Sequence, residues 1–206
     1  MKHMADNSAT RQLLSEWSGS RRLLVASHYF TIYGTPLQKS LEGLFRSILY
    51  GILREEPSLI AKVVPLRLEE VENEQPPWTQ RELEEALRRV QIPETVEVSI
   101  CFFIDGLDEY TGDHFEICQT LRKLSLNPHI KLCVSSRPWN VFEDAFGSMS
   151  GAKLYMQDLT HNDICRYTDS VLRLHPRWDA LEEETGRPSS EALVGEVVNK
   201  ANGVFL

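Results

Sequence analysis

The sequence predicts an α/β fold in which a mostly parallel sheet is flanked by helices. Short apolar runs typical of buried strands alternate with longer segments whose apolar residues recur every three or four positions. This alternation, over residues 4–156, is typical of the strand–helix–strand units that build parallel sheets. The runs at 98–104 and 130–134 are apolar almost throughout, so we expect central strands covered on both faces.

The elements of the first half follow from these periodicities. The pattern predicts a helix at residues 4–17, a strand at 22–30, and helices at 37–55 and 58–64. An acidic loop at 66–77 and a capped helix at 79–91 follow. Apolar residues at three-and-four spacing make 37–55 a strongly amphipathic helix. Thr79 with Glu82 forms a capping-box pattern, in which each side chain satisfies a backbone donor of the other residue.

The second half continues the alternation and then becomes helical. It predicts strands at residues 96–105 and 130–136 and a weaker strand at 153–156. Helices are predicted at 112–125, at 139–146 (a short one), at 160–174 and at 189–202. We therefore expect an α/β domain over residues 1–158, followed by the start of a smaller helical unit over residues 159–206.

The composition excludes several classes of protein. Hydrophobic residues make up 42% of the chain and charged residues 25%, which argues against disorder and low complexity. A net charge of −8 without a basic stripe argues against a nucleic-acid partner. The longest wholly apolar run, 100–104, is far shorter than the roughly 20 residues of a membrane helix. Because the four cysteines contain no C-x-x-C pair, we expect a reduced cytoplasmic protein without a membrane partner, a zinc site or a structural disulfide.

Three carboxylates gather directly after the strongest predicted strand. Asp105, Asp108 and Glu109 lie within five residues, at the end of a strand where parallel sheets bind ligands. A hard cation such as Mg²⁺ would offset their mutual repulsion, and Gly106 would let the backbone turn close to a ligand. An acidic loop in front of a helix N-terminus explains the same residues without a ligand.

An arginine follows the next strand. Arg137, within Ser135–Pro138, could bind phosphate through its planar fork, or it could pair with Asp105 or Asp108 in a purely structural contact. Positions 105 and 137 are one strand–helix–strand unit apart. We therefore expect their side chains to face one crevice from adjacent strands.

Three other patterns are weaker. Residues 105–116 have the length of an EF-hand loop, but Tyr110 stands where that loop needs glycine. Residues 34–40 lie between a strand and a helix like a phosphate loop, but the second glycine is missing and Pro36 removes a backbone donor. His28, inside a predicted strand, is expected to be a packed histidine rather than a ligand. The sequence predicts neither a calcium site nor a phosphate loop in these segments.

Two of these segments resemble a known family. Residues 102–110, Phe-Phe-Ile-Asp-Gly-Leu-Asp-Glu-Tyr, resemble the Walker B segment of NACHT-type (STAND) P-loop NTPases, the signalling ATPases of NOD-like receptors. Ser135–Pro138 resembles the sensor 1 strand of that family. Residues 23–30 and 34–37 resemble the second strand and second helix of fungal NACHT proteins of the nephrocystin-like N-terminal type. The resemblance covers practically the whole chain.

The resemblance implies roles for individual residues. Asp105 would hold the Mg²⁺ of bound ATP, and Asp108 and Glu109 would be the catalytic acidic pair that orients or activates water. Arg137 would contact the γ-phosphate, and the helices after Thr160 would begin the lid. ATP binding switches such receptors between a closed monomer and an open oligomer, so the implied protein partner is a second copy or a full-length relative.

The chain departs from the family at its start. Family members carry a Walker A loop on the first strand, whereas Met1–Asn7 resembles the helix that follows that loop. Residues 199–206 resemble family sequence that continues further. The resemblance thus implies a fragment without the first strand and without Walker A.

This departure predicts weak nucleotide binding. Losing about four charge-assisted phosphate contacts removes roughly 6–12 kcal/mol, whereas micromolar affinity corresponds to about 8 kcal/mol. We predict that the chain alone binds ATP weakly or not at all. One alternative is a non-enzymatic interaction module or decoy that pairs with a full-length relative. Another is an unrelated Mg²⁺-dependent α/β enzyme that uses Asp105 and Asp108.

Overall fold

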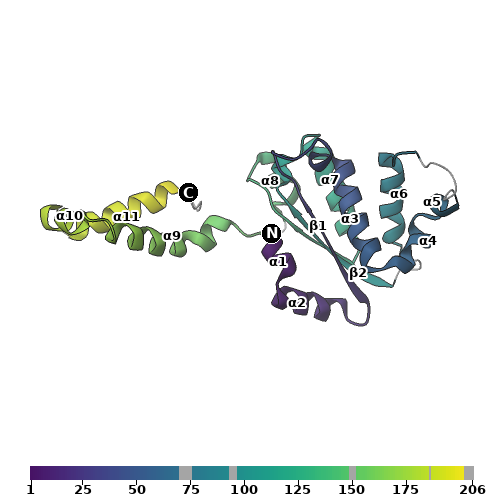
Figure 1. The fold of residues 1–206 in the computed structure, drawn as a ribbon, viewed down its shortest axis with the longest axis horizontal. Coiled ribbons are helices and arrows are strands. Elements are labelled where there is room, and N and C mark those ends of the chain that lie inside the picture. Colours follow the sequence, from purple (N-terminus) through teal and green to yellow (C-terminus); the bar gives the residue numbers. More distant parts are fainter. Residues whose placement is uncertain (70–75, 93–96, 149–151, 186, 202–206) are drawn as a thin grey trace. The chain divides into compact units, whose positions relative to one another are not determined.

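The computed structural model divides the chain into two compact units, Met1–Ser148 and Met149–Leu206 (Figure 1). It describes residues 1–69, 76–92, 97–148, 152–185 and 187–201. The predicted division into domains at residue 158 stays a prediction.

The first unit is built on a three-stranded parallel sheet. Strands β1 (Arg22–Tyr29), β2 (Val98–Asp105) and β3 (Ile130–Val134) lie in the order β1-β2-β3. This confirms the predicted α/β class with a parallel sheet. Seven of the eight residues of β2 are buried, so it is the central strand that its apolar run predicts.

The expectation that 130–134 is also a central strand is wrong for the described sheet. Strand β3 pairs with β2 alone among the described strands, and its last three residues are only half-buried. An apolar run records burial of side chains on the faces of a sheet, and it does not record whether both edges of the strand are paired.

Helices cover both faces of this sheet. One face packs against α3 (Leu41–Glu55), α6 (Gln80–Val90), α7 (His114–Ser125) and α8 (Asn140–Phe146), which form one large apolar core with alternate residues of β2. The other face contacts α1 (Lys2–Asp6) and α2 (Ser8–Ser18) through a smaller cluster that includes Val25, Cys101 and Phe103. Alternation of side chains along a strand produces this division of the core.

Short helical segments complete the connections. They are the 3₁₀ turns η1 (Leu37–Lys39), η2 (Pro57–Leu59) and η3 (Leu107–Glu109), and the helices α4 (Ile60–Val63) and α5 (Pro65–Glu69). The start of the predicted loop 66–77 is therefore helical in α5, and residues 70–75 of that prediction lie outside the described residues.

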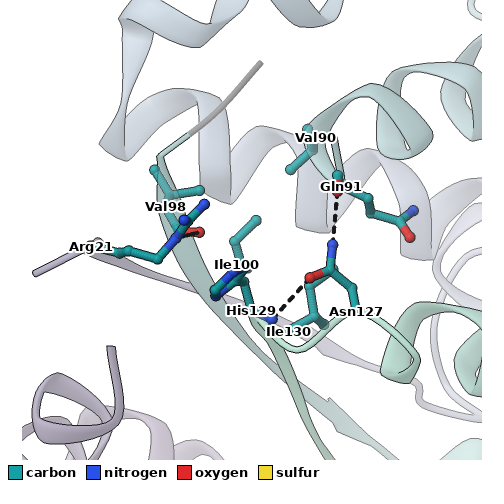
Figure 2. A pocket seen from close by; sticks show the side chains of 8 residues that line it. All are labelled: Arg21, Val90, Gln91, Val98, Ile100, Asn127, His129 and Ile130. Carbon is teal, nitrogen blue, oxygen red and sulfur yellow. Dashed lines mark hydrogen bonds between the residues drawn. The ribbon is translucent and has the colours of Figure 1, made fainter. Parts of the chain in front are cut away.

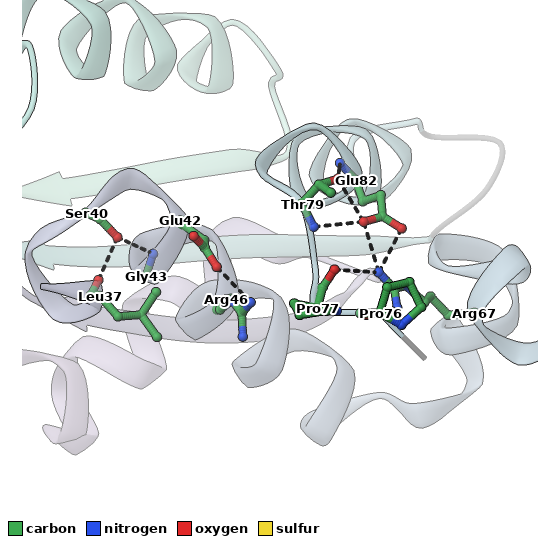
Figure 3. Close-up of polar contacts among 10 residues, drawn as sticks. All are labelled: Leu37, Ser40, Glu42, Gly43, Arg46, Arg67, Pro76, Pro77, Thr79 and Glu82. Carbon is green, nitrogen blue, oxygen red and sulfur yellow. Dashed lines mark hydrogen bonds and ion pairs between the residues drawn. The ribbon is translucent and has the colours of Figure 1, made fainter. Parts of the chain in front are cut away.

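The helix starts are fixed by side-chain caps (Figure 3). Ser40 Oγ accepts a hydrogen bond from Gly43 N (3.0 Å) at the start of α3. The predicted capping box between Thr79 and Glu82 is present at the start of α6. The guanidinium of Arg67, which is buried, donates to both carboxylate oxygens of Glu82 at 2.9 Å, so the same carboxylate joins α5 to α6.

Three predicted elements also differ from the structure. The helix expected over 37–55 is interrupted at Ser40, which caps α3, so residues 37–39 form the separate 3₁₀ turn η1. The helix expected over 4–17 is broken at Asn7, whose side chain caps α2 by accepting from Ala9 N at 2.9 Å. The strand expected over 153–156 is wrong, because 153–155 are irregular and Met156 begins a helix. Leu154 is largely exposed and none of the described strands pairs with this segment, so an extended conformation gains neither burial nor strand pairing there.

The second unit is helical, as its sequence predicts. It consists of α9 (Met156–Arg173), α10 (Trp178–Thr185) and α11 (Arg187–Ala201), with α9 and α11 in contact. Ile164, Trp178 and Val198 are its buried apolar residues. The sequence did not predict α10. Within the described part of the chain, no helix is long and apolar enough to cross a membrane.

Candidate functional site

The candidate site lies where β2 and β3 end. Ile104 pairs with Val134, and two hydrogen bonds extend the strand pairing beyond the strands themselves. Ser135 N donates to Ile104 O at 3.0 Å, and Leu107 N donates to Ser135 O at 2.9 Å. This register brings the segment after β2 beside the segment after β3, as the spacing of Asp105 and Arg137 predicts.

Asp105 is held by a serine from the neighbouring strand. Ser135 Oγ donates a short hydrogen bond to Asp105 Oδ1 and accepts one from Gly106 N at 3.2 Å. The second carboxylate oxygen of Asp105, a half-buried residue, has no hydrogen-bond or ion-pair partner among the described residues. The protein therefore holds one oxygen and leaves the other without a polar partner.

Gly106 turns the chain immediately after Asp105. Its φ is +71°, in the left-handed region that side chains with a Cβ rarely adopt, and an added Cβ would lie 3.3 Å from Phe30 O. The turn leads into η3, where Leu107 is fully buried and anchors the segment. Asp108 and Glu109 are consequently directed to different neighbours.

Asp108 contacts the arginine. Its side chain is only 7% exposed, and it accepts from Arg137 N at 3.0 Å and pairs with Arg137 Nε at 3.3 Å. The Arg137 side chain is 70% exposed. The arginine end of this ion pair is open to water, whereas its carboxylate end is buried. Of the two structural pairings left open by the sequence, the one with Asp108 is formed.

Glu109 contacts the loop between β1 and α3. Its Oε2 accepts from Ile32 N at 2.6 Å, and Lys39 Nζ donates to Ile32 O at 3.3 Å. Thr111 donates to Lys39 O through both its backbone N (3.0 Å) and its Oγ1 (3.1 Å). Glu109 therefore ties residues 31–39 to the segment after β2.

His28 lies near the end of β1 and is 5% exposed, as expected for a packed histidine. Its Nδ1 lies 3.0 Å from Ser47 Oγ, and that hydroxyl donates to Gly43 O at 2.8 Å. Because the Ser47 hydroxyl donates its proton to Gly43 O, it accepts the hydrogen bond from His28, and the neutral imidazole carries its proton on Nδ1. Burial lowers the pKa of His28 to about 4, although the backbone of Gln38 partly offsets this effect.

The residues present fit a Mg²⁺ ion only in part. No cluster of three His, Cys, Asp or Glu side chains suited to a metal occurs in the described portion of the chain. Mg²⁺ is commonly held by one or two carboxylates, with water and substrate phosphates completing its shell. Asp105 beside the hydroxyl of Ser135 fits that pattern, so the metal would depend on phosphate oxygens for the rest of its coordination.

Residues 34–40 form no phosphate cradle. The amide of Gly34 donates to Thr31 O (2.9 Å), Thr35 N to Gln38 Oε1 (2.8 Å), and Lys39 N to Pro36 O (3.2 Å). These backbone donors are used inside the turn itself. The interpretation of this segment as a turn rather than a phosphate loop therefore agrees with the structure.

A small pocket lies at the opposite end of the strands (Figure 2). Arg21 Nε donates to Val98 O at 3.2 Å, Asn127 Nδ2 donates to Gln91 O at 2.8 Å, and His129 N donates to Asn127 Oδ1 at 2.9 Å. These polar groups bind one another and hold the amino-terminal ends of the strands in place. Ligands of open parallel sheets bind at the other, carboxyl end.

Sequence reasoning placed Asp105, Asp108, Glu109 and Arg137 in one region, and the structure puts Asp108 in contact with Arg137. It missed the role of Ser135. A signal was present, because Ser135 stands two residues before Arg137 at a strand end and therefore faces the same side of the segment.

The comparison with known proteins gives one match. The family model described as Nephrocystin 3, N-terminal, matches residues 4–137. No curated protein and no solved structure matches the chain. The matched span contains the whole sheet, the carboxylates after β2 and Arg137.

Proposed function

Because the chain belongs to the nephrocystin 3 N-terminal family, we propose that it is the core of a NACHT-type signalling switch that responds to ATP. The supporting observation is the arrangement at the ends of β2 and β3. There, Asp105 has one carboxylate oxygen without a hydrogen-bond partner, and Asp108 holds an exposed Arg137 that follows the neighbouring strand. The carboxyl ends of parallel strands are where such sheets bind nucleotides.

Each residue has a distinct task in this proposal. Asp105 holds the Mg²⁺ of Mg·ATP, which neutralises phosphate charge when it is bound. Ser135 fixes the carboxylate of Asp105 in place. Arg137 binds the terminal phosphate, and when its exposed side chain leaves Asp108, that buried carboxylate still accepts a hydrogen bond from Arg137 N.

Asp108 and Glu109 are proposed to order water at the terminal phosphate. In the structure both carboxylates have protein partners, Arg137 and Ile32 N respectively. Their role in hydrolysis thus requires these contacts to open. We therefore propose a binding switch in which turnover is slow.

The chain alone is proposed to bind Mg·ATP weakly or not at all. Its 206 residues contain no G-x-x-x-x-G-K-[ST] motif, and the amides of Gly34, Thr35, Gln38 and Lys39 are used within their own turn. A phosphate loop supplies several charge-assisted contacts, each of about 1.5–3 kcal/mol. Asp105 acts on the nucleotide mainly through the metal and does not replace them.

The second candidate is a non-enzymatic interaction module that pairs with a full-length relative. Strand β3 favours it, because the strand pairs with β2 alone among the described strands and its exposed backbone groups can accept another strand. Binding of a full-length relative without any effect of Mg·ATP would favour this candidate over the first.

Calorimetric titration of Mg·ATP tests the proposal. It is applied to this chain and to the chain preceded by a phosphate loop from a family member. We expect micromolar binding by the longer protein, weaker by at least about tenfold in Asp105→Asn. The matched control, Asp144→Asn, changes an exposed carboxylate on α8 and leaves binding as it is. Equal affinity of Asp105→Asn and the parent would refute the assignment.

A further inference from the structure

Helix α9 carries a histidine and a cysteine one turn apart. His161 and Cys165 stand four positions apart, which places them on the same face of the helix. The distance between His161 Nε2 and Cys165 Sγ is 3.7 Å. Imidazole nitrogen and thiolate sulfur are the two commonest ligands of protein zinc sites.

The separation of the two atoms matches a shared metal ion. Zn–S and Zn–N bonds of about 2.3 and 2.05 Å at a tetrahedral angle put sulfur and nitrogen about 3.6 Å apart. The observed 3.7 Å, a thiol–imidazole hydrogen-bond contact in the structure, is close to that separation. Since both belong to one helix, the backbone already holds the pair, and metal binding orders little else.

The surroundings of the pair leave it accessible to solvent. His161 is exposed and Cys165 is half-buried, whereas Ile164 and Thr168 beside them are buried and fix the helix. Asp169 continues the same face one turn further, with its carboxylate 2.7 Å from Arg173 Nε. No third His, Cys, Asp or Glu completes the site within the described residues, so two of four positions stay open.

We propose that His161 and Cys165 form a two-ligand site for a borderline-soft divalent cation of the zinc class. The thiol of Cys165 loses its proton to solvent, Sγ and the unprotonated Nε2 of His161 each donate an electron pair to the metal, and no electron transfer takes place. Water fills the two remaining positions. This inference goes beyond the proposed function, and it concerns a different ion because thiolate and imidazole do not suit Mg²⁺.

The other thiols do not offer an equivalent site. Cys101 and Cys118 are buried, and Cys133 is half-buried at the sheet. Burial raises the pKa of all three thiols, that of Cys101 to about 12, and so disfavours their thiolates. Cys165 differs from these three because an imidazole is in contact with it. We therefore expect the thiolate of Cys165, and not theirs, to bind the metal.

Cobalt and zinc titrations of the full chain test this site. Co²⁺ reports thiolate ligation by a charge-transfer absorption band. Zn²⁺ calorimetry in two buffers of different ionisation enthalpy counts the proton released by the thiol. We expect one metal per chain, about one proton released, and a micromolar Kd, weaker than that of a four-ligand site. A large excess of Mg²⁺ should leave the binding as it is.

Single substitutions then assign the ligands. Cys165→Ser should abolish the charge-transfer band, and His161→Ala should weaken binding at least about tenfold. His175→Ala, which removes another exposed histidine, should leave it within about twofold. Circular dichroism confirms that the helices remain in each variant. Absence of the band at millimolar Co²⁺, or its persistence in Cys165→Ser, would overturn the proposal.

Discussion

The packing of His28 predicts a specific loss of stability in mild acid. The residue is 5% exposed, and burial lowers its pKa from 6.5 to about 4. In the unfolded chain the imidazole regains its ordinary pKa. Between pH 6.5 and 4 the unfolded state therefore binds more protons than the folded state, so the free energy of unfolding decreases as the pH falls through this window.

The size of this effect follows from the two pKa values. A pKa of 6.5 in the unfolded state and about 4 in the folded state gives a loss of about 2 kcal/mol between pH 7 and pH 5. The full difference, reached below pH 4, is about 3 kcal/mol. Both values are upper limits, because any water that reaches the ring reduces the desolvation that causes them.

Urea denaturation at pH 7 and pH 5 measures the effect, with His28→Asn as the matched variant. The asparagine amide can still donate to Ser47, but it does not titrate. Carboxylates contribute equally to both proteins, so their pH dependence cancels in the comparison. We expect the parent to lose about 2 kcal/mol more than the variant over this interval. Equal losses would refute the assignment of a buried neutral imidazole.

Three further substitutions test contacts that support the fold or the site. Gly106→Ala forces a Cβ into a left-handed turn, so we expect at least about 1 kcal/mol of destabilisation in urea, and an unchanged midpoint would contradict this. Arg67→Leu leaves Glu82 without its buried partner, and the free energy of unfolding in urea should decrease by about 1–3 kcal/mol. The control Lys200→Met removes an exposed ion pair and should leave the free energy of unfolding almost unchanged. Glu109→Ala removes the acceptor of Ile32 N, and amide hydrogen exchange at Ile32 should accelerate about tenfold, while unchanged exchange would show that another group holds the loop.

The main elements could be predicted because their sequences carry one dominant signal. The helix at 41–55 has apolar residues on a single face, and all seven of its buried residues belong to that stripe or border it. Strand β2 is apolar on both faces because helices cover both sides of the sheet at its centre. Hydrophobic periodicity reflects burial directly, and both of these segments carry many buried residues.

Other features depend on interactions that periodicity does not record. The break at Asn7 follows from a side chain that caps α2, although the apolar pattern continues across it. Residues 153–155 include the β-prone Tyr155 but pair with none of the described strands. The position of β3 at an edge of the described sheet is likewise set by pairing and not by composition.

The candidate site was predicted as a region and not as a set of contacts. The lengths of the strand–helix–strand unit placed Asp105 and Arg137 at adjacent strand ends. Which carboxylate contacts the arginine depends on the turn at Gly106 and on η3, which send Asp108 to Arg137 and Glu109 to Ile32. Side-chain directions after a three-residue turn do not follow from spacing alone.

The central claim is that this end of the sheet recognises the terminal phosphate of ATP. The most direct measurement compares Mg·ATP and Mg·ADP binding by the phosphate-loop-bearing protein with and without Arg137→Ala. Because only ATP has a γ-phosphate, the substitution should weaken ATP binding about 10–100-fold and leave ADP binding within about twofold. Equal losses for both nucleotides, or no loss for ATP, would contradict the account.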